Sequence, residues 1–161
     1  MAANDVYINP GTEITPTISA GTGVAFGAGQ KSDAIALAAL YATARPYDYR
    51  WTCHAKWQNP ALVGESLDLY FAEANATGLY DGGVTAVDEE FTDEDGLKNL
   101  KYFGNVAVTN ETEEQEVSSG EVSLTSHSAV LVVWNGSAGG DLAVDGFEFK
   151  MIPVPMQVQT S

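Results

Sequence analysis

Polar and apolar side chains alternate along residues 47–58. The aromatic or apolar members share one parity and are Tyr47, Tyr49, Trp51, Cys53, Ala55 and Trp57. Because successive side chains of a strand point to opposite faces, the pattern predicts a long strand with one buried face and one wet face. In a helix, the same rings would be scattered around the axis. A strand that buries so many rings on one side needs an opposing sheet to cover it.

Four other segments show shorter runs of the same alternation, separated by turn residues. They are 66–74, 97–108, 121–126 and 146–154. In the second segment Gly104 predicts a bulge or a bend, since glycine weakens the interior of a strand. In the last segment Pro153 and Pro155 predict an end at a sheet edge, because proline cannot donate a hydrogen bond to a ladder.

A continuous apolar run occupies residues 129–134, between Ser128 and Asn135. A short apolar run without alternation is typical of a strand whose two faces are both covered. We therefore expect either a central strand here or a strand at a subunit contact.

The first 31 residues are rich in Gly, Thr, Ala and Pro. We interpret residues 1–31 as an extended N-terminal arm that contributes little core. Residues 23–32 superficially suggest a phosphate-binding loop. That motif requires lysine directly after glycine, however, and here Gln30 separates Gly29 from Lys31. The sequence therefore does not predict a nucleotide site.

Residues 32–44 fit two local structures. Their alanines and leucines suit a helix with Ser32 or Asp33 as the N-cap. The alternation of Ile35 and Leu37 suits an early strand, which is the interpretation we prefer. Further along, the polar residues from 78 to 95 are expected to form a long loop.

The predicted strands number about eight and follow one another at spacings typical of β-sandwiches. No segment shows a convincing long amphipathic helix. The sequence therefore predicts an all-β fold, a two-sheet antiparallel β-sandwich that is jelly-roll-like. We expect an N-terminal arm at 1–31, the sandwich domain at 32–155 and a polar C-terminal tail at 156–161.

Charge narrows the range of partners. The 161 residues include 22 acidic and 7 basic side chains, which gives a formal net charge of −15. Such a chain repels phosphate backbones and anionic lipid surfaces, so neither nucleic acid nor membrane is expected as a partner. Solubility is the simplest reason for the acidity. The N-terminal residues have no basic region followed by an apolar run, so no signal peptide is expected.

Residues with catalytic or metal-binding chemistry are few. His54 and His127 are the only histidines, and no pair with Cys53, the single cysteine, has a recognised zinc spacing. We expect both histidines at the surface and Cys53 in the core. Since no nucleophile motif is found either, we predict no catalytic, cofactor-binding or metal site residues, and no enzyme.

Two features leave a binding function open. The acidic segment 88–95 offers many oxygen ligands for calcium, although a charged loop is more often simply solvated. The three tryptophans, Trp51, Trp57 and Trp134, could form a platform for sugar rings. Their strand pattern instead favours the core.

The order of these segments resembles a family of small structural proteins of tailed bacteriophages, the capsid decoration (cement) or auxiliary virion proteins. The likeness covers the chain from about residue 30 onward. It rests on the successive segments SDAIALAAL, ESLDLYFAEA, NATGLYDGG, LKNLKYFGNVAV, SAVLVVWNGSAGGDLA and FEFKMIPVP. Members of this family tend to have a basic or aromatic residue before the apolar run, whereas this chain has Ser126, His127 and Ser128.

The resemblance implies a non-enzymatic virion protein on the outer surface of the capsid. The implied partners are the major capsid protein and other copies of the chain, with a homotrimer expected ahead of a homodimer. The arm at 1–31 would add strands to neighbouring subunits. The alternative functions are a carbohydrate-binding β-sandwich module and a component of the phage tail or baseplate.

Overall fold

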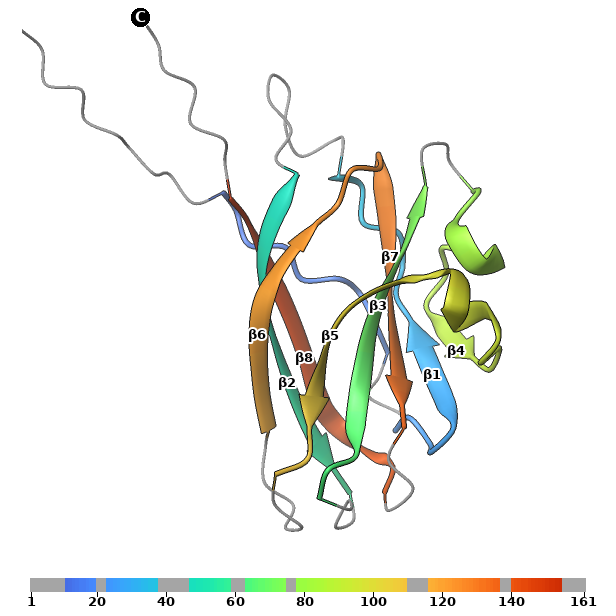
Figure 1. Ribbon diagram of the computed structural model, residues 1–161, viewed down its shortest axis with the longest axis vertical. Coiled ribbons are helices and arrows are strands. Elements are labelled where there is room, and N and C mark those ends of the chain that lie inside the picture. Colours follow the sequence, from blue (N-terminus) through green and yellow to red (C-terminus); the bar gives the residue numbers. More distant parts are fainter. Residues whose placement is uncertain are drawn as a thin grey trace, which may run out of the picture.

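The computed structural model describes residues 11–19, 23–37, 47–58, 63–74, 78–109, 116–136 and 140–154. Over these residues the chain forms eight β-strands and short 3-10 helices (Figure 1). The strands are β1 (Ala28–Lys31), β2 (Asp48–Trp57), β3 (Ser66–Ala74), β4 (Glu89–Phe91), β5 (Lys101–Ala107), β6 (Glu116–Ser123), β7 (Ser128–Asn135) and β8 (Leu142–Val154). The 3-10 helices are η3 (Asp81–Gly83) and η4 (Gly96–Asn99).

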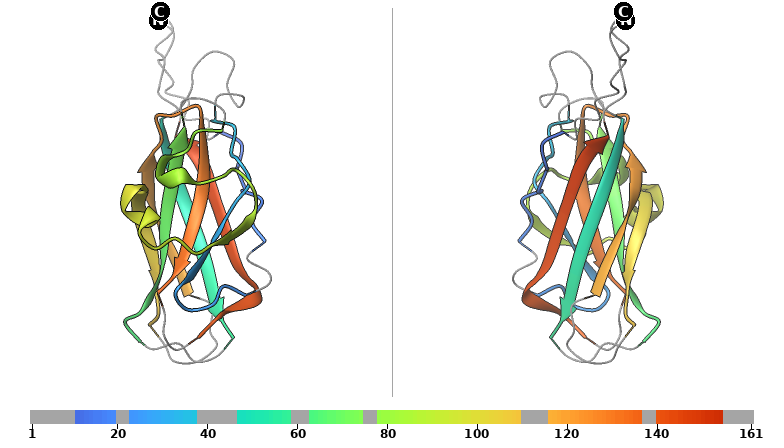
Figure 2. Two further views of the ribbon diagram at one scale, coloured as in Figure 1. Left: turned by 90° about the vertical axis from the view of Figure 1, so that its right-hand side faces the viewer. Right: turned by 90° about the vertical axis from the view of Figure 1, so that its left-hand side faces the viewer.

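The strands form two antiparallel sheets that lie face to face (Figures 1 and 2). The larger sheet has the order β4-β1-β7-β3-β5, and the smaller has the order β6-β2-β8. The chain crosses between the sheets at each step from β1 to β3 and again from β5 to β8, as in a jelly roll. The predicted all-β fold, a two-sheet antiparallel β-sandwich, is confirmed.

β2 is the central strand of the smaller sheet and has the predicted alternation. Its buried residues are Tyr49, Trp51, Cys53, Ala55 and Trp57, and the residues between them are exposed or partly exposed. Trp51 lies opposite Gly120 of β6 and Met151 of β8. Because β2 is hydrogen-bonded on both sides, its register fixes which face of its neighbours is buried.

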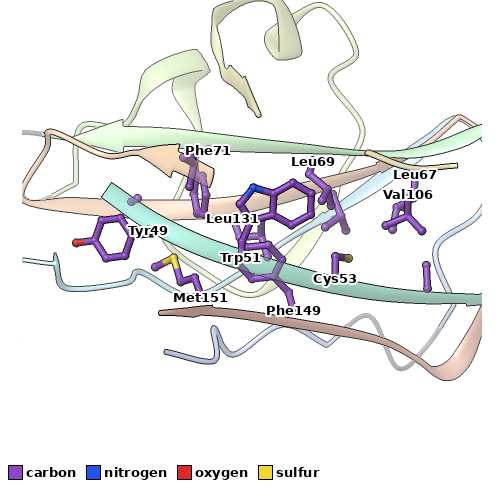
Figure 3. Packing of buried hydrophobic residues seen from close by; sticks show 14 of the residues in the cluster. Tyr49, Trp51, Cys53, Leu67, Leu69, Phe71, Val106, Leu131, Phe149 and Met151 are labelled. Carbon is purple, nitrogen blue, oxygen red and sulfur yellow. The ribbon is translucent and has the colours of Figure 1, made fainter. Parts of the chain in front are cut away.

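The main core lies between the sheets and is rich in aromatic rings (Figure 3). The indole of Trp51 makes an edge contact with Phe103, with ring centroids 5.3 Å apart, and stacks on Phe149 at 6.3 Å. Phe71 of β3 stacks on Phe103 at 4.6 Å. These rings join both sheets, as the aromatic pattern of residues 47–58 requires.

β7 is covered on both faces, as the apolar run predicts. Ala129, Leu131 and Val133 belong to the main core, and the alternate residues belong to a second cluster on the outer face of the larger sheet. The alternate residues are Val130, Val132 and Trp134.

The cover over this second cluster is the segment 78–100. The predicted polar loop from 78 to 95 is largely irregular and exposed, but it needs correction because it contains η3 and β4 and buries apolar side chains. The buried residues of the cover are Tyr80, Val84, Phe91, Leu97 and Leu100. They are spaced irregularly because the segment alternates between 3-10 turns and the short β4. The cover therefore lacks the periodic pattern by which a strand or a helix is predicted.

The predicted boundary between arm and sandwich also needs correction, because residues 28–31 are an internal strand of the larger sheet. β1 pairs with β4 on one side and with β7 on the other. The sequence of β1 does not indicate a buried strand, because it contains the polar residues Gln30 and Lys31, which are buried in the fold. The Lys31 ammonium is paired there with the Glu89 carboxylate, at 2.6 Å, and also donates to Thr85.

Residues 32–37 continue from β1 without forming a strand, so over these residues the predicted strand at 32–44 is wrong. Ile35 makes an isolated antiparallel bridge with Ala129, and Leu37 is fully buried. Ser32 is buried, and its hydroxyl accepts a hydrogen bond from the backbone N–H of Leu131, which explains a polar residue in the core. The rest of the segment, 38–44, and the C-terminal tail at 156–161 lie outside the described residues.

Candidate functional site

The N-terminal segment 11–19 lies along the outer edge of β8 (Figure 2). The backbone N–H of Ile14 donates to the carbonyl of Met151 at 2.8 Å, and that of Met151 donates back to Ile14 at 2.9 Å. Ile14 and Ile18 also pack against the main core. The segment therefore binds an exposed sheet edge by main-chain hydrogen bonds and apolar anchors, which is the mode of strand addition.

Asp88 joins this segment to the rest of the fold. Its carboxylate accepts hydrogen bonds from Ser19 at 2.5 Å and from Gln30 of β1 at 2.7 Å. Its backbone N–H donates to the carboxylate of Asp33, whose own N–H donates to the carbonyl of Thr17. Although burial alone raises the pKa of the Asp88 carboxyl, the hydrogen bonds from Ser19 and Gln30 hold it below its ordinary value.

The outer face of the smaller sheet is not covered by any described segment. Arg50 pairs with Glu121 at 3.2 Å across β2 and β6, and Lys150 of β8 pairs with Glu148 at 2.6 Å. Lys150 also lies 3.9 Å from Glu13 of the N-terminal segment. We call this surface the open face.

The outward-facing positions of β2, β6 and β8 carry as many basic as acidic side chains, with Glu13 of the N-terminal segment beside them. The three basic and three acidic residues of these strands are Arg50, Lys56, Lys150, Asp48, Glu121 and Glu148. The chain has 22 acidic and 7 basic residues, so 19 and 4 remain elsewhere, together with the whole formal charge of −15. The sequence indicates the β2 part of the open face through the polar residues that alternate over 48–56. The residues that β6 and β8 contribute to this face could be identified only from the fold.

Glu73 holds the turn between β6 and β7 at one end of the sandwich. Its carboxylate accepts hydrogen bonds from the backbone N–H groups of Thr125 and Ser126, at 2.9 and 3.1 Å. It also accepts one from Lys101 of β5, at 3.3 Å. Burial raises the pKa of the Glu73 carboxyl, but the bonds from Ser126, Lys101 and Thr125 outweigh burial and lower it. This network stabilises the turn, and no motif in the sequence predicts it.

The three tryptophans are all buried, with exposed fractions of 4% for Trp51, 3% for Trp57 and 7% for Trp134. Trp51 and Trp57 lie in the main core and Trp134 lies under the cover, against Phe91. None of them presents a ring face to a sugar. Their placement in the core, which the strand pattern favoured, is confirmed.

The two histidines and the cysteine lie where expected. His127 is exposed, and His54 is partly exposed with its Nδ1 3.8 Å from Glu148. Cys53 is fully buried, and burial raises the pKa of its thiol far above the ordinary value. Within the described ranges, no three His, Cys, Asp or Glu side chains come together as a metal site would require.

Several carboxylates of the acidic segment 88–95 bond to donors of the protein itself. Lys31 and Thr85 bond to Glu89, the backbone N–H of Gly96 bonds to Asp93 at 3.0 Å, and Lys98 bonds to Asp95 at 2.5 Å. The carboxylate pKa of Glu89 is lowered by its hydrogen bond from Lys31. These oxygens fasten the cover to the sheet and shape its turns.

Neither a family model nor a curated protein matches this chain. In the part of the chain that the structure describes, no helix has the length and apolar character needed to cross a membrane.

Proposed function

We propose that the protein is a structural protein of a bacteriophage virion, a capsid decoration (cement) protein. It binds the outside of the head and stabilises contacts between major capsid protein subunits, without acting as an enzyme. The observation that carries this proposal is the N-terminal segment 11–19, held on the edge of β8 by main-chain bonds at Ile14. A segment held in this way can exchange onto the equivalent edge of a neighbouring subunit.

Charge also supports a location outside the shell, away from packaged DNA. With a formal net charge of −15, the protein is repelled by nucleic acid. The open face, with its paired basic and acidic side chains, is the surface that we propose for contact with a partner protein. The symmetric positions of a shell favour closed oligomers, and we propose a homotrimer ahead of a homodimer.

Co-sedimentation with capsids tests the proposal. Purified protein would be mixed with heads that lack it, and the bound fraction would be measured against total protein. We expect saturable binding at a fixed ratio to the major capsid protein, and the ratio identifies the symmetry position. Absence of binding to heads, with binding to isolated tails, would instead favour the tail or baseplate alternative.

A point variant tests the role of the N-terminal segment. Ile14→Pro removes the N–H that donates to Met151 while leaving β1 to β8 unchanged in sequence. We expect weaker capsid binding by this variant, with retained folding shown by circular dichroism. Thr15→Ala, at an exposed neighbouring position, is the matched control and should bind like the unaltered protein. Equal binding by all three proteins would contradict the role of the segment.

A further inference from the structure

Two tyrosines and two polar side chains form a square on the outer face of the larger sheet, at its β3–β5 edge. In the register of these strands Tyr70 lies opposite Tyr102, and Asp68 lies opposite Asn105. We call these four residues the tyrosine patch. Opposite residues are about 5 Å apart and alternate residues of one strand about 7 Å apart, so the patch has the scale of one or two sugar rings.

The two rings are held in place from below. Tyr70 is partly buried and packs against the second cluster, under the edge of the cover. Tyr102 is 53% exposed and meets Tyr70 edge-on, with centroids 5.4 Å apart and ring planes at 65°. An exposed ring that is already fixed loses little conformational freedom when a ligand binds.

A β-bulge produces this arrangement. The register between β3 and β5 shifts between Leu69 and Tyr70, opposite Gly104. Because of the extra residue, Phe103 and Gly104 both face the main core, so Tyr102 and Asn105, three positions apart, lie on the same outer face. Bulges of this kind often re-aim side chains at functional sites.

The polar half of the patch offers both kinds of hydrogen-bonding group. Asp68 accepts a hydrogen bond from the Ser66 hydroxyl at 2.8 Å, which orients the carboxylate. Burial and the Asp68 charge raise the pKa of the Tyr70 and Tyr102 hydroxyls, which favours their hydrogen-bond-donating form. Asn105 adds an amide, which donates through nitrogen and accepts through oxygen.

We infer that the tyrosine patch binds a neutral pyranose sugar. The apolar face of the sugar ring packs on Tyr102, and its hydroxyl groups bond to the Asp68 carboxylate and the Asn105 amide. Acidic sugars are excluded because Asp68 and the net charge of −15 repel them. This inference does not depend on the capsid proposal, because it uses a different sheet and a different surface.

The patch is a shallow surface, so each copy is expected to bind in the millimolar range. Several copies on an oligomer or on a particle would together hold a glycan-coated surface far more tightly. A neutral polysaccharide on a cell surface is therefore a ligand of suitable chemistry.

The test uses the full chain and saturation-transfer NMR with methyl glucopyranoside, methyl galactopyranoside, N-acetylglucosamine and maltoheptaose as probes. Tyr102→Ala removes the exposed ring, Tyr102→Phe keeps the ring without its hydroxyl, and Asp68→Asn removes the charge. Phe26→Ala is the control, because Phe26 is equally exposed, at 57%, but lies in the turn before β1.

We expect saturation transfer to at least one probe, weakened about tenfold by Tyr102→Ala, a loss at the upper end for a ring contact. The Tyr102→Phe and Phe26→Ala variants should retain binding. The inference is overturned if none of the four probes binds, or if Tyr102→Ala and Phe26→Ala bind alike. Loss of capsid binding in Tyr102→Ala without any sugar binding would also overturn it, and would identify the patch as a protein contact.

Discussion

The indole of Trp51 fills the space that a side chain at position 104 would need. A Cβ added to Gly104 would lie 2.5 Å from Cζ2 of Trp51, and one added to Gly120 would lie 2.9 Å from the same atom. The ring thus lies in a slot between β5 and β6, where the two sheets approach each other. The indole explains why both strands have glycine here, since any larger residue would clash with the ring.

Gly104→Ala should therefore destabilise the protein, by about 1–3 kcal/mol, since the added methyl overpacks a filled core. Urea unfolding followed by circular dichroism measures this change in the free energy of unfolding. Trp51→Phe provides the control background, because the smaller ring leaves room for the methyl. In that background the penalty of Gly104→Ala should shrink, and an undiminished penalty would show that the indole is not its cause.

Glu73→Gln should weaken the fold and change its pH dependence. The folded carboxyl has a lowered pKa, so its contribution to stability is present above the ordinary pKa of glutamate and is lost as pH falls through the folded value. We expect a loss of about 1–3 kcal/mol at neutral pH, typical of hydrogen bonds to a charged group. The loss should diminish in acid, as measured by urea unfolding between pH 7 and pH 3.

Glu121→Gln is the matched control for this prediction. Glu121 pairs with Arg50 in solvent, with 70% of its side chain exposed, and should contribute less than about 1 kcal/mol. If the two variants lose stability equally, the bonds of Glu73 to the turn at 125–126 are not what stabilises that end of the sandwich.

Asp88→Ala should loosen the N-terminal segment without unfolding the sandwich. The variant loses the acceptor for Ser19 and Gln30, so the bond from Asp33 N–H to the Thr17 carbonyl should open more often. Amide hydrogen exchange at Asp33 should accelerate, while exchange at Leu131 in β7 stays slow. Asp95→Ala is the control. It removes an exposed carboxylate of the acidic segment 88–95 and should leave amide exchange at Asp33 unchanged.

Cys53 should resist thiol reagents in the folded protein and react promptly in urea. Its side chain is fully buried, and burial raises the pKa of the thiol, so neither access nor the reactive thiolate is available. A colorimetric thiol assay across a urea titration measures this difference. The labelling midpoint should coincide with the unfolding midpoint, and labelling well below that midpoint would contradict the burial.

Periodicity predicted the strands whose burial is regular, and failed where burial depends on partners distant in sequence. The alternation of 47–58 and the run at 129–134 carried enough apolar residues to predict β2 and the two-sided β7. β1 contains one buried lysine and no apolar alternation. The burial of this lysine depends on its pairing with Glu89, which lies 58 positions away in the sequence. The cover at 78–100 buries single residues from irregular turns, a pattern that no period describes.

The candidate surfaces show the same limit. The sequence offers the tryptophans as the alternative for sugar binding, and their strand pattern correctly favours the core. Tyr70 and Tyr102 are 32 positions apart in sequence. Only the pairing of β3 with β5, including the bulge at Gly104, brings them to one face.

The two faces of β7 give the molecule two hydrophobic cores that share one wall. Loss of the cover would leave Val130, Val132 and Trp134 in water while the other face of the strand stayed packed. We therefore expect the cover, which includes the edge strand β4 of the larger sheet, to open before the shared strand β7. An opened cover would expose an apolar sheet surface that favours aggregation. The hydrogen bonds at Lys31 and Asp88, which hold the cover closed, therefore also oppose aggregation.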